Sequence, residues 1–511
     1  MREDSLKKRY LYKILSKLAM APFTLLTQAI IPRGLGPELY GQFTFLTNFF
    51  QQVLAFFDSG TSLAFYTSLS KNLKDKSIIR FYGSFTCVAI LLTSSVTSLV
   101  YFFDKEEYIF PDQQVLFVWM ALFYSSILWL SDSLYKVVDA YGLTVKGEVI
   151  LILQRVLGLL MLAGMYFLGK ITLLNFFLYN YFILIVLIVW WSFHLFKNDV
   201  NLIKIPPLSK DETIKKVKFF WKYSSPLITY SLLGMIAGIF DNWLLIQISG
   251  SAQQGYFGLA FRLSSISFLF TGAMTQLLTR EFSIAFVAGD EIKIRSLFER
   301  FVPILYVVVA FLSIFFAVQA DVLTFLFGGD SFKEAIVAIS VMSLYPIHQT
   351  YGQLSGSLFY ATGKTELYRN IGCSMLPLSL VLTSILIGPP RYHGLELGGL
   401  GLAIKTLAVQ FIGVNIQLYY NTKFLNLSFK KYFSHQLIVV GVFFILAFCA
   451  KSLAQLFLGN ILLIFIVSGF LYTLLSIMTI YIFPIVLSLN KTEINQFIGQ
   501  LKSKILLKKQ G

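Results

Sequence analysis

The sequence predicts an all-α integral membrane protein with about 14 transmembrane helices: two six-helix lobes, then two C-terminal helices. Composition, recurring apolar windows and the placement of positive charge carry this prediction. Of the 511 residues, 56% are hydrophobic and only 13% are charged, and the mean hydropathy is +0.72. Soluble domains are about one quarter charged, so composition alone indicates a membrane protein.

Apolar windows of about 20 residues, enough for a helix to cross a bilayer, recur along the whole chain. We expect helices over 11–32, 41–67, 79–103, 113–138, 147–168, 171–196, 219–248, 254–279, 297–319, 332–360, 366–388, 398–420, 432–450 and 460–487. The first window follows a basic start, as in a signal peptide. It reaches Pro32 without a convincing small-residue cleavage site, so we expect a retained helix.

Lys and Arg lie mostly on one side of this map. With a cytoplasmic N-terminus, 33 of the 42 fall in inward segments, six in outward loops and three inside helices. The positive-inside rule therefore predicts that both termini are cytoplasmic. The net charge of +16 is then explained by topology and by attraction to anionic membrane lipid, with no need for nucleic acid.

Short loops and one longer basic segment define the expected organisation. The segment contains Pro206 and Pro207 and separates the first twelve windows into two sets of six. The predicted parts are an N-lobe over 1–196, a cytoplasmic linker over 197–218, a C-lobe over 219–420, and the last two helices with a basic tail over 421–511.

The two halves repeat each other weakly. Residues 39–52 align with 253–266, which pairs Gly41 with Gly255 and sets Asn48 opposite Arg262. Internal repeats around a midplane site are a common transporter architecture. The sequence therefore predicts a transporter whose two lobes differ chemically at that site.

Arg262 lies about seven residues into the helix expected from Gly255, about 10 Å deep at 1.5 Å per residue. An arginine at that depth costs a few kcal/mol unless it faces protein, water or a ligand. The same helical face continues with small or polar residues, Ser265, Gly272, Gln276 and Thr279, and is interrupted only by Leu269. We interpret this face as one wall of a wet, basic cavity.

Other intramembrane charges have two interpretations. Asp241 lies at the depth of Arg262 across one turn, and Asp132 at that of Arg155 across another. Each pair is either a structural ion pair or part of a functional site. Lys405 has no acidic partner evident from sequence, so it either faces a substrate or snorkels to the outer interface.

Two polar stripes complete the candidate site. On the second expected helix, Thr44, Asn48 and Gln52 lead to Asp58, which either binds a coupling ion or caps a kink beside Ser59. On the tenth, Gln349 and Gln353 lie one turn apart and are suited to hydrogen bonding with sugars.

Several function classes are disfavoured. The three cysteines and four histidines have no metal-ligand spacing, so we expect neither metal nor cofactor. The sequence ATGKT at 361–365 lacks the first glycine of a P-loop, since Leu358 stands there, so ATP hydrolysis is not expected. No loop is large enough for an external catalytic domain. A membrane-embedded enzyme would need a convergent His/Asp/Glu set, which is not found.

Four segments resemble the polysaccharide flippase (Wzx-type) family of the multidrug/oligosaccharidyl-lipid/polysaccharide (MOP) exporter superfamily: 33–45, 241–263, 361–370 and 398–406. The resemblance implies the MATE-like MOP fold of two lobes in an inverted V. It also implies a carrier of undecaprenyl-diphosphate-linked oligosaccharide from the cytoplasmic to the outer leaflet of a bacterial inner membrane. In related lipid II flippases a cavity arginine occupies the position of Arg262. Their dense arginine set on the first two helices is absent here, where only Arg33 stands.

The resemblance further implies a monomer, and a polysaccharide polymerase as partner in making O-antigen, capsule or a similar polymer. Without an ATP site, we expect the energy to come from an ion gradient, with H⁺ or Na⁺ as coupling ion, or from the substrate gradient. The substrate-binding candidates are Arg262, Lys405, Arg33, Arg155, Asn48, Gln349, Gln353 and Gln276. The ion-coupling or ion-pair candidates are Asp58, Asp132 and Asp241. These carboxylates also keep open the alternative of a cation-coupled multidrug exporter of the same superfamily.

Overall fold

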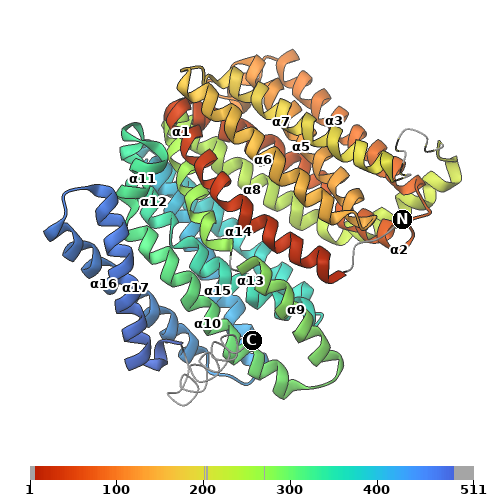
Figure 1. Ribbon diagram of the computed structural model, residues 1–511. Coiled ribbons are helices and arrows are strands. Elements are labelled where there is room, and N and C mark those ends of the chain that lie inside the picture. The colour runs from red at the N-terminus through yellow and green to blue at the C-terminus, as the bar shows by residue number, and fades with distance from the viewer. Residues whose placement is uncertain are drawn as a thin grey trace, which may run out of the picture. The chain divides into compact units, whose positions relative to one another are not determined.

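The computed structural model describes residues 6–198, 200, 202, 205, 207–269 and 271–487. This part of the chain consists of helices joined by turns, without a strand (Figure 1). The predicted all-α class is confirmed. Pro206 of the expected linker and the basic tail at 488–511 lie outside the described residues.

By its internal contacts the chain divides into two compact units. Unit 1 comprises residues up to Gly255 together with Ile387–Pro389, and unit 2 comprises Tyr256–Leu386 with the residues from Pro390 onward. Unit 1 holds α1 (Leu6–Asp58), α2 (Thr61–Lys71), α3 (Ser77–Phe102), α4 (Glu106–Ile109), α5 (Val115–Ala140), α6 (Thr144–Phe167), α7 (Leu173–Lys197) and most of α8 (Lys210–Ser264).

Unit 2 begins with the last turns of α8 and continues through shorter helices and 3₁₀ segments into long apolar ones. Its elements are η1 (Ser265–Leu269), α9 (Thr271–Val287), α10 (Glu291–Val318), α11 (Ala320–Gly328), η2 (Asp330–Ala335), α12 (Ile336–Met342), α13 (Tyr345–Ala361), α14 (Thr365–Ile387), η3 (Pro390–Tyr392), α15 (Gly398–Phe424), α16 (Phe429–Phe457), α17 (Ile461–Ile482) and η4 (Pro484–Leu487).

The unit boundary differs from the division expected at 197–218. The first part of α8 packs within unit 1. A side chain at Gly238 of α8 would collide with Gln52 of α1, and the indole Nε1 of Trp243 donates to the carbonyl of Tyr108 at 2.6 Å. These contacts require the helices to approach each other closely. The charged residues of the linker, from which the boundary was predicted, give no indication of such an approach. The lobe boundaries taken from sequence stay a prediction.

Ten helices of the described part are long and apolar enough to cross a membrane, so the chain is a multi-pass membrane protein. They are α3, α5, α6, α7, α8, α10, α14, α15, α16 and α17. The count of fourteen stays a prediction, because α1 and α8 each join two expected windows. In addition, α9 and α13 have only 17 residues each.

Each unit has its own aromatic core. In unit 1 the rings of Phe65 and Tyr82 stack at 4.4 Å. In unit 2 Phe311 of α10 stacks on Tyr472 of α17 at 4.7 Å, and the Tyr472 hydroxyl donates to the Phe311 carbonyl at 2.9 Å. The last two helices, side by side in Figure 1, are therefore anchored on α10.

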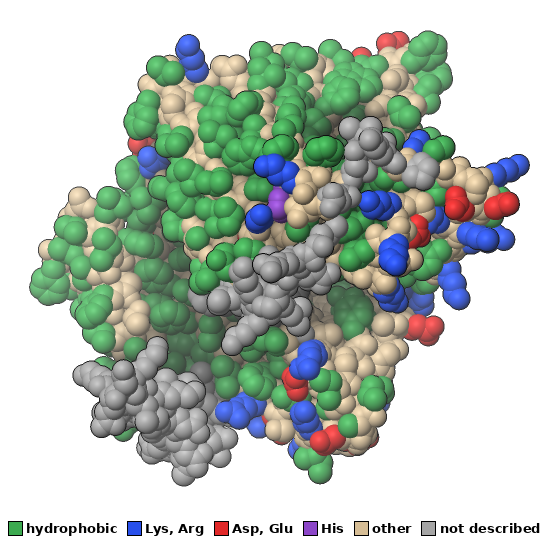
Figure 2. All heavy atoms as spheres, turned by 45° about the vertical axis from the view of Figure 1, so that its right-hand side comes forward, with side chains coloured by type: hydrophobic (Ala, Val, Ile, Leu, Met, Phe, Trp, Pro, Cys, Tyr) green, Lys and Arg blue, Asp and Glu red, His purple; other side chains and the backbone are tan. Residues whose placement is uncertain are grey.

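Large apolar side chains also cover much of the outside. Phe167 is 85% exposed and Phe457 is 82% exposed. On the face drawn in Figure 2, hydrophobic side chains dominate, and Lys and Arg lie in groups rather than being spread evenly. Such a surface fits lipid rather than water.

Candidate functional site

The two expected repeats share a backbone feature. Gly36 interrupts α1 with φ 73° and ψ 170°, and Gly250 interrupts α8 with φ 81° and ψ 174°. A side chain would make this conformation costly. Each break lies five residues before a paired glycine, Gly41 or Gly255. Sequence reasoning missed both breaks, although the shared Gly-x₄-Gly spacing could have revealed them.

Two candidates lie on α1 in unit 1. Arg33, three residues before the break at Gly36, is exposed and has an interaction partner. Asn48, beyond the break, is also exposed. Thr44 of the same predicted stripe is buried and donates to the carbonyl of Gly41 at 3.0 Å. The stripe is thus only partly available to a ligand.

Asp58 closes α1 and caps α2. Its Oδ1 accepts from the backbone N–H of Ser62 at 2.7 Å and from the hydroxyl of Thr61 at 3.0 Å. Ser59 and Gly60 between the helices have positive φ values, 30° and 85°. The carboxylate therefore caps this kink, and a role of Asp58 in ion coupling stays a prediction.

Asp132 is exposed on α5, where the charges acting on it are those of Lys136 and Asp58. Arg155 is exposed on α6, and its charge acts on the hydroxyl of Tyr179. Among the residues that the structure describes, the ion pairs do not include Asp132 with Arg155. The two carboxylates Asp58 and Asp132 lie near each other instead.

The second expected pair is divided between the units. Asp241 lies on α8 in unit 1, is partly exposed and has an interaction partner. Arg262 lies on the last turn of α8 in unit 2 and is exposed. The Ser265 hydroxyl donates to the Arg262 carbonyl at 2.6 Å. This hydrogen bond holds the backbone where α8 ends and η1 begins. Within the described part of unit 2, the guanidinium makes no ion pair.

A polar seam joins α9 to α13 in unit 2. The Thr275 hydroxyl lies 3.4 Å from Gln353 Oε1, and the Thr279 hydroxyl donates to Ser357 Oγ at 2.9 Å. Gln349, half-buried, precedes Gln353 by one turn. The side chain of Gln276, also on α9, lies outside the described part. The seam brings the predicted glutamine stripe together with the threonines of the neighbouring helix.

Lys405 is only 6% exposed on α15 and has an interaction partner. The Lys405 side chain is therefore buried. A buried lysine is costly unless its charge is compensated, which agrees with the presence of a partner.

Sequence reasoning missed a carboxylate network in unit 1. Asp139, 6% exposed, accepts from Lys13 Nζ at 3.0 Å, from the Tyr66 hydroxyl at 2.9 Å and from the Thr144 hydroxyl at 2.6 Å. The nearby Glu148, 4% exposed, accepts from Ser16 and from the Tyr135 hydroxyl. The network ties the start of α1 to the α5–α6 turn. No sequence pattern marks it, because its members come from distant helices.

Outside the membrane-spanning helices, the loop between α2 and α3 holds a perturbed carboxyl group. Partial burial raises the pKa of Asp75. The hydrogen bond from Ser77 and the ion pair with Lys216, at 3.0 Å, outweigh this effect and hold that pKa below its usual value. Lys216 lies on α8, so this pair fixes the start of α8 to unit 1.

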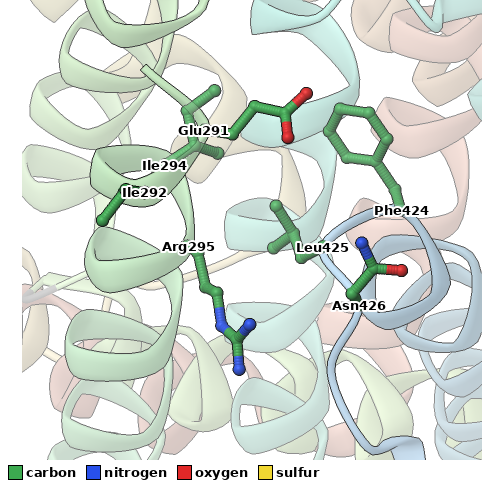
Figure 3. Close-up of a pocket in the computed structure, with 7 residues that line it drawn as sticks. All are labelled: Glu291, Ile292, Ile294, Arg295, Phe424, Leu425 and Asn426. Atoms are coloured by element: carbon green, nitrogen blue, oxygen red, sulfur yellow. The ribbon is translucent and has the colours of Figure 1, made fainter.

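Unit 2 also has a surface pocket, lined by Glu291, Ile292, Ile294 and Arg295 of α10, by Phe424 at the end of α15, and by Leu425 and Asn426 that follow it. In Figure 3 the Glu291 carboxylate points toward Phe424, whereas the Arg295 guanidinium points away from both. Three lysines, Lys423, Lys430 and Lys431, flank the α15–α16 turn. We call this the basic end of unit 2.

No metal-binding group is found in the described residues: three or more His, Cys, Asp or Glu side chains do not converge anywhere among them. Cys87, Cys373 and Cys449 are free thiols.

No family profile and no curated protein matches this chain. Solved structures do match. Lipid II flippase MurJ, in an inward closed conformation, aligns with a TM-score of 0.65 at 15% identity, over 92% of this chain and 99% of that one. An inward-facing multidrug resistance MATE transporter aligns with a TM-score of 0.56 at 16% identity, over 80% of this chain and 94% of that one.

A MOP superfamily transporter from Pyrococcus furiosus aligns with a TM-score of 0.55 at 12% identity, over 82% of this chain and 95% of that one. At these identities the likeness concerns the fold. The chain has the fold of MOP superfamily transporters, with MurJ and MATE proteins among its structural neighbours.

Proposed function

We propose that this protein is a Wzx-type flippase that moves undecaprenyl-diphosphate-linked oligosaccharide from the cytoplasmic to the outer leaflet. The extent of the MurJ alignment carries the proposal. The 8% of the chain that it leaves uncovered is much shorter than the segment 421–511, so the alignment reaches into the last two helices. The alignments with the MATE transporter and with the Pyrococcus furiosus transporter leave 20% and 18% of the chain uncovered, about the length of that segment.

The residue chemistry agrees with a diphosphate head group. A diphosphate that crosses a low-dielectric region must exchange its hydration for cations and hydrogen-bond donors. Arg262 is exposed and makes no ion pair within the described part of unit 2, and Lys405 supplies a buried positive charge. The seam of Gln349, Gln353 and Thr275 supplies amide and hydroxyl groups for a glycan.

The proposed mechanism is alternating access driven by an H⁺ or Na⁺ gradient, without ATP hydrolysis. A swing of the two lobes carries the head group while the polyprenyl tail stays in lipid. The protein then works as a monomer in a bacterial inner membrane, with both termini cytoplasmic, and passes its product to a polysaccharide polymerase.

A cation-coupled multidrug exporter is the second candidate function. The proximity of Asp58 and Asp132 favours it, because neighbouring carboxylates suit cationic drugs or a coupling ion. In that case a deletion strain keeps its surface glycan and overexpression confers drug resistance. The flippase proposal expects the reverse pattern.

The decisive experiment is leaflet exposure of a fluorescent polyprenyl-diphosphate oligosaccharide in proteoliposomes. We expect protein-dependent exposure that falls at least about tenfold in Arg262→Ala, since a lost charge-assisted contact is worth 1.5–3 kcal/mol. Arg391→Ala is the matched control, because Arg391 is exposed on η3 and stacks on Tyr392. Its activity should match that of the wild type.

Normal exposure by a well-folded Arg262→Ala variant would remove this residue from the mechanism. Absence of exposure with several glycans, under imposed proton and sodium gradients, would favour the drug-exporter function. Asp58 would then be the main candidate for ion coupling.

A further inference from the structure

Unit 2 buries a group of polar side chains, here called the Tyr–His cluster, that the proposed glycan and diphosphate contacts do not use. All are at most 8% exposed and come from α10, α13 and α16. The members are Tyr306, His348, Tyr351, Ser355, Tyr432, His435 and Gln436. The cluster lies inside unit 2 and away from its apolar outer faces.

Tyr306 of α10 is the centre of this cluster. Its ring lies 4.9 Å from that of Tyr351, nearly at right angles, 6.1 Å from the His435 imidazole and 6.3 Å from the His348 imidazole. Three helices therefore direct hydroxyl and imidazole groups into one region.

Most polar atoms of the cluster have no hydrogen-bond partner among the described residues. They are the hydroxyls of Tyr306, Tyr351, Tyr432 and Ser355, Nδ1 of both histidines, and Oε1 of Gln436. An unsatisfied buried polar group costs about 1–3 kcal/mol. Seven of them together would cost about as much as a whole domain's stability. The cluster must therefore bind something polar.

The hydrogen-bonding roles define what it binds. His435 Nε2 donates to the Val486 carbonyl at 2.8 Å, so its Nδ1 offers a lone pair. Gln436 Nε2 donates to Asn415 Oδ1 at 2.9 Å, so its Oε1 is an acceptor. The four hydroxyls can donate or accept. Such a balanced set without a carboxylate suits water, which takes two to four polar partners.

At one end the cluster approaches the basic end of unit 2. Tyr432 packs its ring on Phe298 at 5.6 Å, and the charges of Glu299 and Arg295 act on its hydroxyl. Arg295 in turn lies 3.6 Å from Glu299 and lines the surface pocket of Figure 3. That pocket is thus one side chain away from the cluster.

At the other end lies His348, next to Gln349 of the polar seam. His348 is 13 residues from the C-terminal end of α13, about 20 Å along the helix axis at 1.5 Å per residue. That distance spans well over half of a hydrocarbon core of about 30 Å. The cluster therefore extends from near the surface pocket to His348, whose neighbour in sequence, Gln349, belongs to the predicted glutamine stripe.

We propose that the Tyr–His cluster binds a chain of internal waters that conducts protons between the pocket at Arg295 and His348. Each transfer breaks one O–H or N–H bond and forms another across a hydrogen bond, so no other reactant is consumed. The fixed charges that face it are Lys431, Glu299 and Arg295 at the basic end. α15 and η4 contribute the neutral groups Asn415, Phe411 and the Val486 carbonyl.

This inference names the proton as the coupling ion of the proposed export. Only this role in export rests on the proposed function. The water chain and the proton conduction are measured without any lipid-linked substrate. A failure of the proposed flippase activity is therefore distinguishable from a failure of this inference.

Hydration is tested by radiolytic hydroxyl-radical labelling of the full-length protein in nanodiscs, where a buried tyrosine reacts only beside a bound water. Tyr472 is the matched control, because it is 1% exposed in the same unit and its hydroxyl is bonded to the Phe311 carbonyl. We expect Tyr306 and Tyr351 to react at least about tenfold faster than Tyr472, as internal water requires. Equal rates for the three tyrosines would overturn the proposal.

Conduction is tested in proteoliposomes with an enclosed pH dye and an imposed membrane potential. Tyr306→Phe and His435→Gln should each lower the proton flux at least about tenfold, because each interrupts the hydrogen-bonded chain. Tyr306→Phe removes only an unpartnered hydroxyl, so folding should be retained. His393→Asn is the control, since His393 is exposed in a loop with φ 62°, which Asn tolerates. Unchanged flux in both variants, or wild-type flux equal to that of protein-free vesicles, would overturn it.

Discussion

Gly41 of α1 and Gly255 of α8 meet backbone to backbone. A Cβ atom on Gly41 would lie 1.7 Å from the Ser251 carbonyl oxygen and 2.8 Å from the Gly255 nitrogen. A Cβ atom on Gly255 would lie 2.1 Å from the Pro37 carbonyl oxygen and 3.2 Å from the Gly41 nitrogen. The weak sequence repeat pairs these same two residues. The paired glycines therefore lie where α1 and α8 approach within unit 1, and no side chain fits there.

This contact predicts a strong effect of the smallest substitution. Gly41→Ala or Gly255→Ala should destabilise the protein by at least about 3 kcal/mol, because backbone must move to admit the methyl group. The measurement is the thermal unfolding midpoint in detergent. Gly234→Ala, on the same α8 with open space around its Cβ position, is the control and should be neutral or slightly stabilising. Equal midpoints for all three variants would contradict the close approach.

The Asp139 network predicts a loss of stability in Asp139→Asn. The substitution leaves Lys13 without its carboxylate partner and turns one acceptor oxygen into a donor facing hydroxyl groups. We expect a cost of about 2–4 kcal/mol, visible as a lower unfolding midpoint. Asp104→Asn is the control, because Asp104 is exposed with φ 49°, a conformation that asparagine adopts easily. Similar midpoints for the two variants would show that the network adds little.

Two ion pairs of unit 2 should differ in strength. Lys451 Nζ lies 2.7 Å from Asp321 Oδ1 and 2.9 Å from the Val318 carbonyl, with only 14% of its side chain exposed. Lys333 and Asp330 form a pair at 3.1 Å with both side chains more than 70% exposed. Lys451→Ala should cost about 2–3 kcal/mol, whereas Lys333→Ala should cost at most about 1 kcal/mol.

Proteolysis is a second measure of that difference. Lys451→Ala should expose α16 and α17 to limited digestion, since Lys451 holds α16 against the α10–α11 corner. Equal digestion rates for the Lys451 and Lys333 variants would indicate that the aromatic contacts of Tyr472 suffice to hold the last two helices.

The lowered pKa of Asp75 predicts a pH-dependent stability term. Because the folded pKa lies below the ordinary value of 3.8, the carboxylate stabilises the folded state above that value, and this contribution is lost as the pH falls through the folded pKa. Wild type should therefore be more stable than Asp75→Asn near pH 6. The difference in unfolding midpoint should shrink below about pH 4. A difference that stays constant from neutral to acid pH would contradict the ion pair with Lys216.

The sequence by itself determined the fold class and the multi-pass character of the protein. Both depend on how each stretch partitions between water and lipid, which is a local property of roughly 20 residues. The pairing of Gly41 with Gly255 was also visible in the sequence, because alignment of the two repeats places a glycine at the same position in each.

Only the tertiary structure decided which polar groups meet. The same sequence allowed Asp58 to bind an ion or to cap α2, Arg155 to pair with Asp132 or not, and Lys405 to reach an interface or to be buried. It gave no sign that Asp139 and Lys13, or Tyr306 and His435, lie together. Such contacts join residues more than 100 positions apart. They depend on the rotation and tilt of each helix against its neighbours, which packing of the whole chain sets and hydropathy does not encode.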